Sequence, residues 1–174
     1  RRFSKEFGNQ TAKIFSANNI KSYIFSDLRP TPELSFAVRE LNCSCGIVIT
    51  ASHNPKEYNG YKVYWNDGGQ ITSPHDNNII SEVEKITDFN QINFNFKSDL
   101  IEEIDKKIDK KYIEKIQDLS VYDNSRSKLK IIFSSLHGTG ITQIPNALNA
   151  FGFKNISSVR SQELPDPEFS TVTS

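Results

Sequence analysis

A short, almost wholly apolar run at residues 46–50 (GIVIT) places the tightest constraint on how this chain folds. A strand of this kind belongs inside a sheet, because at a half-solvated position its apolar side chains would alternate with polar ones. The segment 51–55 (ASHNP) follows at once, and its Asn-Pro pair stiffens a turn. The sequence therefore predicts that Ser52 is held just beyond the end of a buried strand.

Helical and strand patterns alternate on both sides of this run. Apolar residues recur at helical spacing in four segments, which we expect to be helices: residues 3–18, a stretch from Thr31-Pro32 to Leu41, a stretch through Ile86 with Ser73 as its N-cap and Pro74 in its first turn, and residues 100–117. Strands are expected at residues 22–25, 46–50 and 61–65, whereas residues 87–99 fit no regular pattern. This alternation predicts an α/β fold with a mixed, mostly parallel sheet sandwiched between helices.

A polar, serine-rich break at residues 120–128 separates two parts of the chain. We expect a first domain over residues 1–122 and the start of a second domain of similar type over residues 123–174. In the second part the pattern predicts a strand at 129–133, a glycine turn (HGTG, 137–140), a helix at 143–151 and a strand at 155–159. We interpret the glycine turn as structural, with His137 supporting packing; the alternative is a phosphate cradle formed by backbone amides.

Composition excludes several classes of partner. The 21 Lys and Arg residues balance the 21 Asp and Glu residues, so we expect neither nucleic acid nor a membrane surface as a partner. No run of apolar residues is long enough to span a bilayer, and no signal peptide is visible, which favours the cytoplasm. Cys43 and Cys45 are two positions apart, a spacing that in a strand puts their Cα atoms near or beyond the limit of roughly 7 Å for a disulfide, so we expect two reduced thiols.

The loop around Ser52 has the residue types that phosphoryl chemistry needs. A small neighbour leaves the serine open to a bulky partner, and His53, Lys56 and Lys62 are close enough in sequence to neutralise an anion. Taken alone, a serine in a turn is most often only a hydrogen-bonded cap. The residue types by themselves therefore leave both interpretations open.

The order of these residues resolves the choice. The string TASHNP at 50–55, with NGYK at 59–62, resembles the signature of the phosphohexose mutase superfamily, in its bacterial phosphoglucomutase/phosphomannomutase branch. Four further segments resemble the same branch: RRFS at 1–4, RPTPEL at 29–34, LHGTG at 136–140 and DPEFSTV at 166–172. The absence of an initiator Met and of the family's acidic metal loop suggests a fragment that covers most of domain 1 and the start of domain 2.

The resemblance implies a phosphoryl carrier at Ser52, which would pass its phosphate to a hexose 1-phosphate and take it back from a hexose 1,6-bisphosphate. It also implies an Mg²⁺ cofactor that is bound in part through the phosphate oxygen on Ser52. By the same resemblance Arg1 and Lys62 would face the phosphate, with Lys62 as general acid/base. His53 would orient the loop, and Asn54, Thr50 and Lys56 would bind phosphate or substrate.

Several alternatives remain open at this point. The substrate is expected to be a glucose or mannose phosphate, with a pentose or amino-sugar phosphate as the alternative. A non-catalytic phosphosugar-binding module on the same fold is the alternative outside enzymes, which the intact TASHNP string and Lys62 disfavour. We expect the isolated piece to be inactive and to self-associate through exposed edges.

Overall fold

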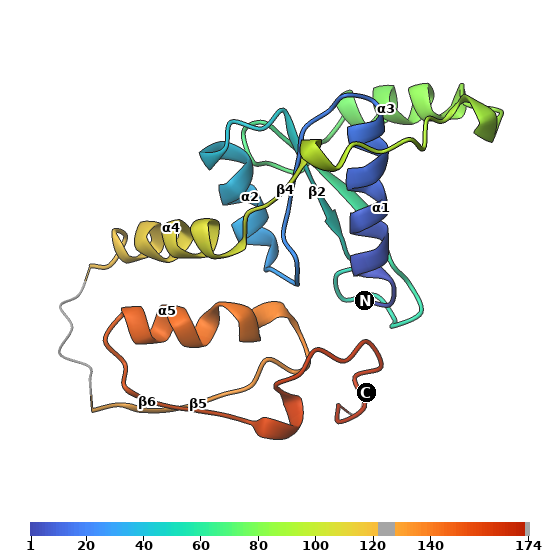
Figure 1. Cartoon of the computed structure of the whole chain (residues 1–174). Helices are drawn as coiled ribbons and strands as arrows, with labels where there is room; N and C mark the ends of the chain where they lie inside the picture. Colours follow the sequence, from blue (N-terminus) through green and yellow to red (C-terminus); the bar gives the residue numbers. More distant parts are fainter. Residues whose placement is uncertain (122–127, 173–174) are drawn as a thin grey trace.

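A computed structural model describes residues 1–121 and 128–172 of the chain (Figure 1). The first part contains α1 (Ser4–Ala17), β1 (Ser22–Ile24), α2 (Thr31–Glu40), β2 (Cys45–Ile49), β3 (Tyr61–Trp65), α3 (His75–Glu84), η1 (Phe89–Gln91), η2 (Ser98–Leu100), β4 (Ile101–Glu103) and α4 (Asp105–Gln117). The second part contains β5 (Lys130–Phe133), η3 (Thr139–Thr142), α5 (Ile144–Ala150), β6 (Asn155–Ser158) and η4 (Arg160–Gln162). The predicted boundary at 122/123 lies outside the described residues.

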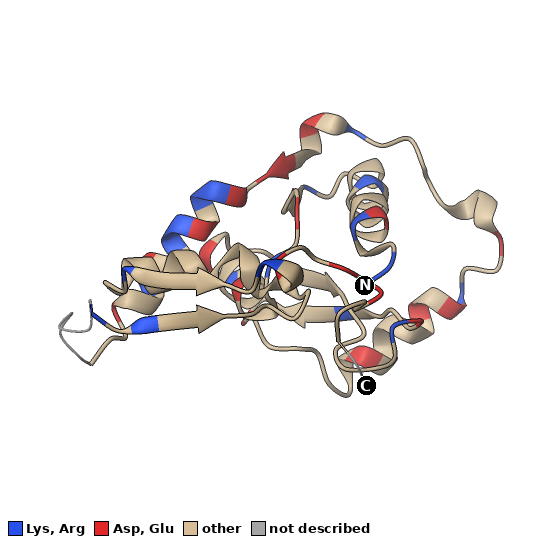
Figure 2. Cartoon of the chain, turned by 90° about the horizontal axis from the view of Figure 1, so that it is seen from below, with Lys and Arg blue, Asp and Glu red and all other residues tan. Residues whose placement is uncertain are grey.

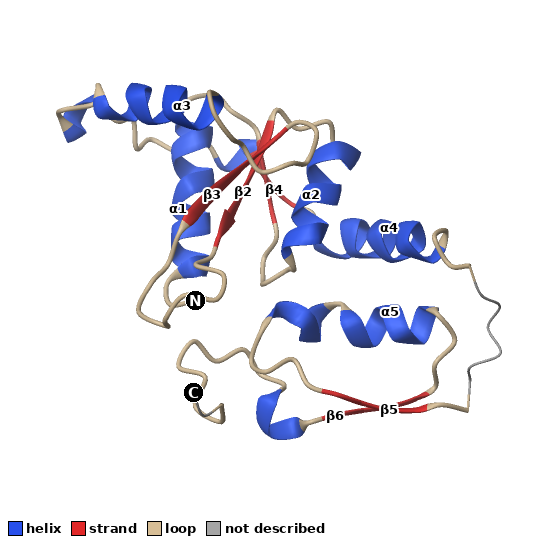
Figure 3. Ribbon diagram, turned by 180° about the vertical axis from the view of Figure 1, so that it is seen from behind, coloured by secondary structure: helices blue, strands red, loops and turns tan. Residues whose placement is uncertain are grey.

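The strands of the described residues form three pairs. β1 and β4 are parallel, β2 and β3 are antiparallel, and β5 and β6 are parallel. The predicted α/β class with mixed, mostly parallel pairing is therefore confirmed, although the strands occur as separate pairs. The parallel pairs are each joined through helices, as parallel connections require. In Figure 3, β5 and β6 lie on the far side of α5 from α4.

The core of the first part forms where α2 and α4 meet. Ala37, Ile104 and Ile108 are buried together, and Tyr23, Phe25, Phe36 and Leu41 pack against them. α2 also lies directly on β2, because a Cβ atom at Gly46 would come within 2.4 Å of the Val38 side chain. The glycine that opens the apolar run is thus required by close packing between helix and strand.

Two of the expected elements were wrong in detail. Residues 101–103 form β4 rather than the first turn of the helix expected at 100–117, because their backbone pairs with Ser22–Ile24 of β1. Ser73 is not an N-cap: α3 begins at His75 after Pro74, and the Ser73 hydroxyl accepts a hydrogen bond from the Asn77 side chain at 3.2 Å. At residues 101–103 the partner strand, distant in sequence, decided the outcome, and no local pattern contains it.

The second part of the chain contacts the first through α5, which lies beside α4 (Figure 1). Gln117 near the end of α4 donates a hydrogen bond to the carbonyl oxygen of Ala150 at 2.6 Å. Gln143, just before α5, donates to Glu33 of α2 at 3.1 Å. Among the described helices, none combines the length and apolar character needed to cross a membrane.

Candidate functional site

The loop between β2 and β3 is shaped by its own backbone hydrogen bonds. Ser52 adopts a left-handed conformation with φ of 55°, which costs a non-glycine residue about 1 kcal/mol. The Ser52 amide donates to the Thr50 hydroxyl oxygen at 3.1 Å, and the Asn54 amide donates to the Ala51 carbonyl oxygen at 3.0 Å. Ser52 thus has a strained backbone conformation, and strained residues of this kind often occur at functional sites.

The two ends of the loop are joined at Gly60. The Thr50 amide donates to the Gly60 carbonyl oxygen at 2.9 Å, which extends the β2–β3 ladder by one step. A Cβ atom at position 60 would lie 2.7 Å from the Thr50 carbonyl oxygen, so only glycine fits here without displacement. Asn59 secures the same corner, since its side-chain amide donates to the Arg2 carbonyl oxygen at 2.8 Å.

The structure brings together three of the predicted site residues at the tip of the loop. The side chain of Ser52 is exposed, and its Oγ lies 3.3 Å from Nδ1 of His53. The guanidinium of Arg1 donates to the Ser52 carbonyl oxygen at 2.6 Å. An exposed hydroxyl beside an imidazole and a fixed guanidinium is an arrangement in which an anion on Ser52 would find a cation and hydrogen-bond donors.

The other predicted site residues lie at varying positions around this tip. Lys62 is in β3 opposite Val48, two positions along the strand from Gly60, and is partly buried. Thr50 shapes the turn through its hydroxyl, whereas Asn54 is exposed and contributes the backbone hydrogen bond to Ala51. Lys56 donates to Glu168 at 2.8 Å, a residue 112 positions away in sequence.

The contact with Glu168 belongs to a set of residues that sequence reasoning missed. Seen from below (Figure 2), the last described stretch of the chain runs close to the N-terminus, and Glu168 accepts a hydrogen bond from Arg2 Nε at 2.5 Å. The Arg1 guanidinium lies over the ring of Phe169 at 5.6 Å from its centroid. The hydrogen bonds from Lys56 and Arg2 lower the pKa of the Glu168 carboxyl. The DPEFSTV motif was the available signal, but a motif does not state what it contacts.

The segment that carries Glu168 is itself held in place by side-chain hydrogen bonds. The Asp166 carboxylate accepts from the Ser170 hydroxyl at 2.6 Å and from the backbone amides of Ser170 and Glu168, which together lower the pKa of Asp166 to about 2. His137 is buried, with Nδ1 2.9 Å from the Leu164 carbonyl oxygen and Nε2 2.7 Å from the Thr171 hydroxyl. The expected packing role of His137 is confirmed, and it serves this segment.

A second charged cluster lies where α2, α4 and the start of α5 meet. Arg29 makes a two-pronged ion pair with Asp109, with N–O distances of 2.7 Å and 2.9 Å. Glu33 is fully buried beside this pair, and its burial, followed by the nearby Asp109 carboxylate, raises the pKa of Glu33 to about 8. One oxygen of Glu33 and the side-chain oxygen of Gln143 have no hydrogen-bond partner within the described part of the chain.

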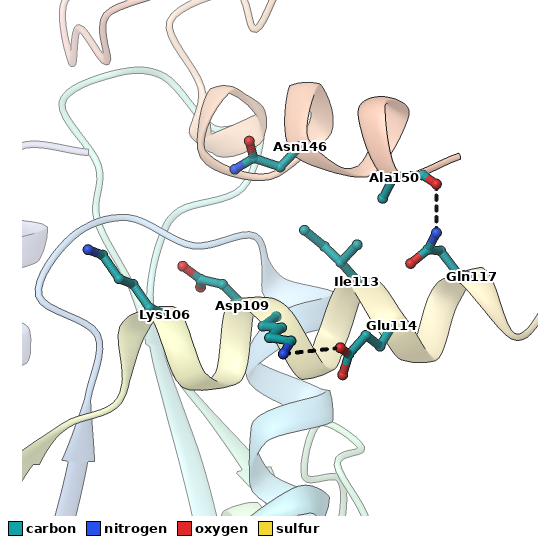
Figure 4. Close-up of a pocket in the computed structure, with 8 residues that line it drawn as sticks. Lys106, Asp109, Ile113, Glu114, Gln117, Asn146 and Ala150 are labelled. Carbon is teal, nitrogen blue, oxygen red and sulfur yellow. Dashed lines mark hydrogen bonds and ion pairs between the residues drawn. The ribbon is translucent and has the colours of Figure 1, made fainter. Parts of the chain in front are cut away.

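The described residues hold no metal cluster at the loop, and a groove that they form lies elsewhere. A groove of about 430 Å³ lies between α4 and α5, where Ile113 faces Asn146 and Gln117 bonds to Ala150 (Figure 4), and it contains none of the predicted site residues. Over residues 1–121 and 128–172 no group of three or more His, Cys, Asp or Glu side chains could hold a metal ion. Cys43 and Cys45 are free thiols, as expected.

Comparison with family models gives two matches that together span most of the chain. The model described as phosphoglucomutase/phosphomannomutase, alpha/beta/alpha domain I, matches residues 1–90. The model for domain II of the same family matches residues 110–174. Residues 91–109 lie between the two matched ranges, and the predicted boundary at 122/123 falls inside the second range.

Curated relatives and a solved structure are similar to the chain along its whole length. A phosphoglucomutase from Staphylococcus haemolyticus is 39% identical over all of the chain, and a human glucose 1,6-bisphosphate synthase is 38% identical over 97% of it. The chain spans about a third of the length of these relatives, 32% and 28% respectively. A crystal structure of a "putative phosphomannomutase" from Thermus thermophilus shares the fold, with a TM-score of 0.78 at 24% identity, over 99% of this chain and 37% of that one.

Proposed function

The chain belongs to the phosphoglucomutase/phosphomannomutase family, and from that premise we propose that the protein interconverts hexose 1-phosphates and hexose 6-phosphates through a phosphorylated Ser52. The single observation that carries the proposal is the Ser52 hydroxyl itself. It is exposed at the tip of a strained turn, and the Arg1 guanidinium binds the carbonyl oxygen of the same residue.

The proposed reaction moves one phosphoryl group in each direction. The bond between Ser52 Oγ and phosphorus breaks, a bond from phosphorus to the free sugar hydroxyl forms, and the hydroxyl proton passes to the serine oxygen. The product is a hexose 1,6-bisphosphate, which then returns its other phosphate to Ser52. Transfers of this kind depend on positioning and on compensation of charge rather than on covalent help from the protein.

Each side chain at the loop has a proposed role in that transfer. Lys62 carries the proton between the sugar hydroxyl and Ser52, and Arg1 compensates the charge of the phosphate, which is about −1.5 to −2 on a phosphoserine. His53 orients the serine through its contact with Oγ. Asn54, Thr50 and Lys56 hold the loop and supply donors for phosphate oxygens.

We also propose Mg²⁺ as the cofactor, because the family membership implies it. The described residues offer the ion no cluster of ligands, so in this part of the protein only a phosphate oxygen on Ser52 would bind it. Mg²⁺ prefers an octahedron of oxygen ligands, and the rest of that octahedron must come from elsewhere in the protein or from water.

The substrate and the place of action are proposed from the same relatives. Glucose or mannose phosphates fit the names in the family description, with pentose and amino-sugar phosphates as the alternatives. Synthesis of glucose 1,6-bisphosphate is a second candidate function, since the human synthase is as similar to the chain as the phosphoglucomutases are. A cytoplasmic location agrees with the two free thiols.

The test is a Ser52→Ala variant of the whole protein, with Ser44→Ala as a control that removes a hydroxyl just before β2. We expect Ser52→Ala to abolish mutase turnover and to lack the added mass of about 80 Da that a phosphoserine brings. Product analysis with glucose 1-phosphate and a separate phosphoryl donor such as an acyl phosphate separates the candidates, because a mutase releases glucose 6-phosphate whereas a synthase, rephosphorylated on Ser52 by the donor, accumulates the bisphosphate. Undiminished turnover by Ser52→Ala would refute both.

A further inference from the structure

Glu168 joins the second part of the chain to the Ser52 loop through Lys56 and to the N-terminal segment through Arg2. We propose that Glu168 is a positioning residue that clamps this loop in the geometry used for phosphoryl transfer. The inference rests on the proposed function and adds a residue to it. It comes from a pair of contacts, because one carboxylate binds Arg2, which follows Arg1, and Lys56, which lies four positions after Ser52.

The two cations that Glu168 binds come from different segments of the chain. Arg2 lies in the N-terminal segment, and Lys56 follows Ser52 in the loop. Arg2 is held at two points. Its backbone carbonyl oxygen accepts a hydrogen bond from Asn59 at the base of the loop, and its side chain is ion-paired with Glu168. These two contacts restrict the movement of Arg2 and of its neighbour Arg1. Glu168 thereby helps hold the Arg1 guanidinium on the Ser52 carbonyl oxygen.

A hydrogen-bonded turn at residues 166–170 orients the Glu168 carboxylate toward Arg2 and Lys56. Asp166 binds the amide of Glu168 at 2.8 Å, and Phe169 adopts a left-handed conformation with φ of 53°. The turn therefore directs Glu168 and the Phe169 ring to the same side, where they contact Arg2 and Arg1 respectively. His137 fixes both ends of the segment from within the second part of the chain.

The contribution of this clamp is to geometry more than to stability. The ion pairs of Glu168 are about half exposed, and exposed pairs of this kind stabilise a fold by only about 0–1 kcal/mol. Phosphoryl transfer, however, is sensitive to small displacements, and a shift of about 1 Å costs as much as a hundredfold in rate. Loss of Glu168 should therefore lower the rate while leaving the fold in place.

Glu168 also sets the charge that a phosphate on Ser52 meets. Glu168 is ion-paired with Arg2 and Lys56, so its negative charge partly cancels the positive charge that these side chains would offer to a phosphate on Ser52. Removing the carboxylate removes a negative charge from the neighbourhood and makes the local potential more positive. A more positive potential favours the doubly charged phosphate and lowers its second pKa.

The experiment compares Glu168→Gln with Glu163→Gln in the whole protein. Both variants lose one negative charge from the same stretch of chain, but no ion pair of Glu163 is present within the described residues. We expect Glu168→Gln to lower kcat about tenfold with KM nearly unchanged, and Glu168→Asp to recover part of that loss. Phosphorus NMR should show a lower second pKa for the phosphoserine of Glu168→Gln only, at an unchanged melting temperature.

Hydrogen exchange gives a reading of the clamp that does not depend on the reaction. The Asn54 and Tyr58 amides are bonded within the loop, and we expect their exchange to accelerate in Glu168→Gln but not in Glu163→Gln. Unchanged protection of these amides would overturn the clamp, whatever the activity. If protection falls while kcat holds, the clamp has no role in transfer and the inference fails. An active Ser52→Ala variant defeats the proposed function instead.

Discussion

The Ser52 loop and the Glu33 cluster both connect the two parts of the chain, but they do so in opposite ways. At the loop, exposed charges meet in solvent, and Glu168 binds Arg2 and Lys56 with its pKa lowered. At the cluster, the carboxyl of Glu33 is buried beside Asp109 and its pKa is raised. We infer from this difference that the cluster supports the association of the two parts, whereas the loop contacts serve the proposed phosphoryl transfer.

Substitution at the loop serine should separate the two regions most completely. Ser52→Ala removes the proposed phosphoryl carrier, so we expect turnover to disappear while the urea unfolding midpoint stays within the error of the wild type. The hydroxyl is exposed and lies 3.3 Å from His53, so little stability depends on it. A marked fall in the midpoint would contradict the division of roles between loop and cluster.

Breaking the ion pair of the cluster should have the reverse effect. Arg29→Gln leaves Asp109 without its two-pronged partner next to a buried carboxyl, and removing one partner of this partly buried pair should cost about 1–3 kcal/mol. The measurement is urea unfolding, with Arg39→Gln of the same helix region as control, since Arg39 is exposed. Equal losses of unfolding free energy in the two variants would show that the Arg29–Asp109 pair does not stabilise the fold more than an exposed arginine does.

The pH dependence of stability should come from Glu33. Between its ordinary pKa of 4.5 and about 8, the native state keeps a proton that the unfolded state has released. Stability is therefore highest at low pH within this window and falls as the pH rises through it, by an amount on the order of 5 kcal/mol. Glu33→Gln should flatten this slope and raise stability at pH 8, as unfolding midpoints at several pH values would reveal. A slope that persists in Glu33→Gln must have another origin.

A smaller effect is expected from the corner of the loop. Gly60→Ala introduces a Cβ atom 2.7 Å from the Thr50 carbonyl oxygen, so the loop must shift. We expect a loss of stability of about 1 kcal/mol together with a larger relative loss of turnover, measured by unfolding and by kcat. Gly8→Ala is the matched control, because a Cβ atom there meets nothing within 4 Å.

The smallest effect concerns the surface of α3, which belongs to neither region. Its expected apolar stripe is not buried: Ile80, Val83 and the nearby Ile86 are each more than half exposed. Exposed apolar side chains that adjoin one another favour association, so the predicted self-association of the chain should weaken in an Ile80→Ser, Val83→Ser variant. Light scattering over a range of concentrations measures this, and a wild-type chain that stays monomeric throughout would contradict it.

Much of the site could be predicted from the sequence because its parts are close together along the chain. The apolar run, the turn and the second strand occupy residues 45–65, and local hydrogen bonds from Thr50 to Gly60 complete the loop. Helices with an apolar stripe and a clear beginning, such as α1 and α2, were expected within one or two residues of where they lie. The helix expected from residue 100 failed at its start, because β1 provided a strand partner that no local pattern contains.

The sequence by itself determined the family, the α/β class and the serine that is offered to solvent, since each depends on a contiguous motif or a short period. Only the tertiary structure decided that Lys56 meets Glu168 across 112 positions and that Glu33 meets Gln143 across 110. The positions of polar side chains in the sequence follow no period that would reveal which distant residues they contact. Which carboxylate is paired in solvent and which is buried with its proton is settled by how the two parts of the chain pack together.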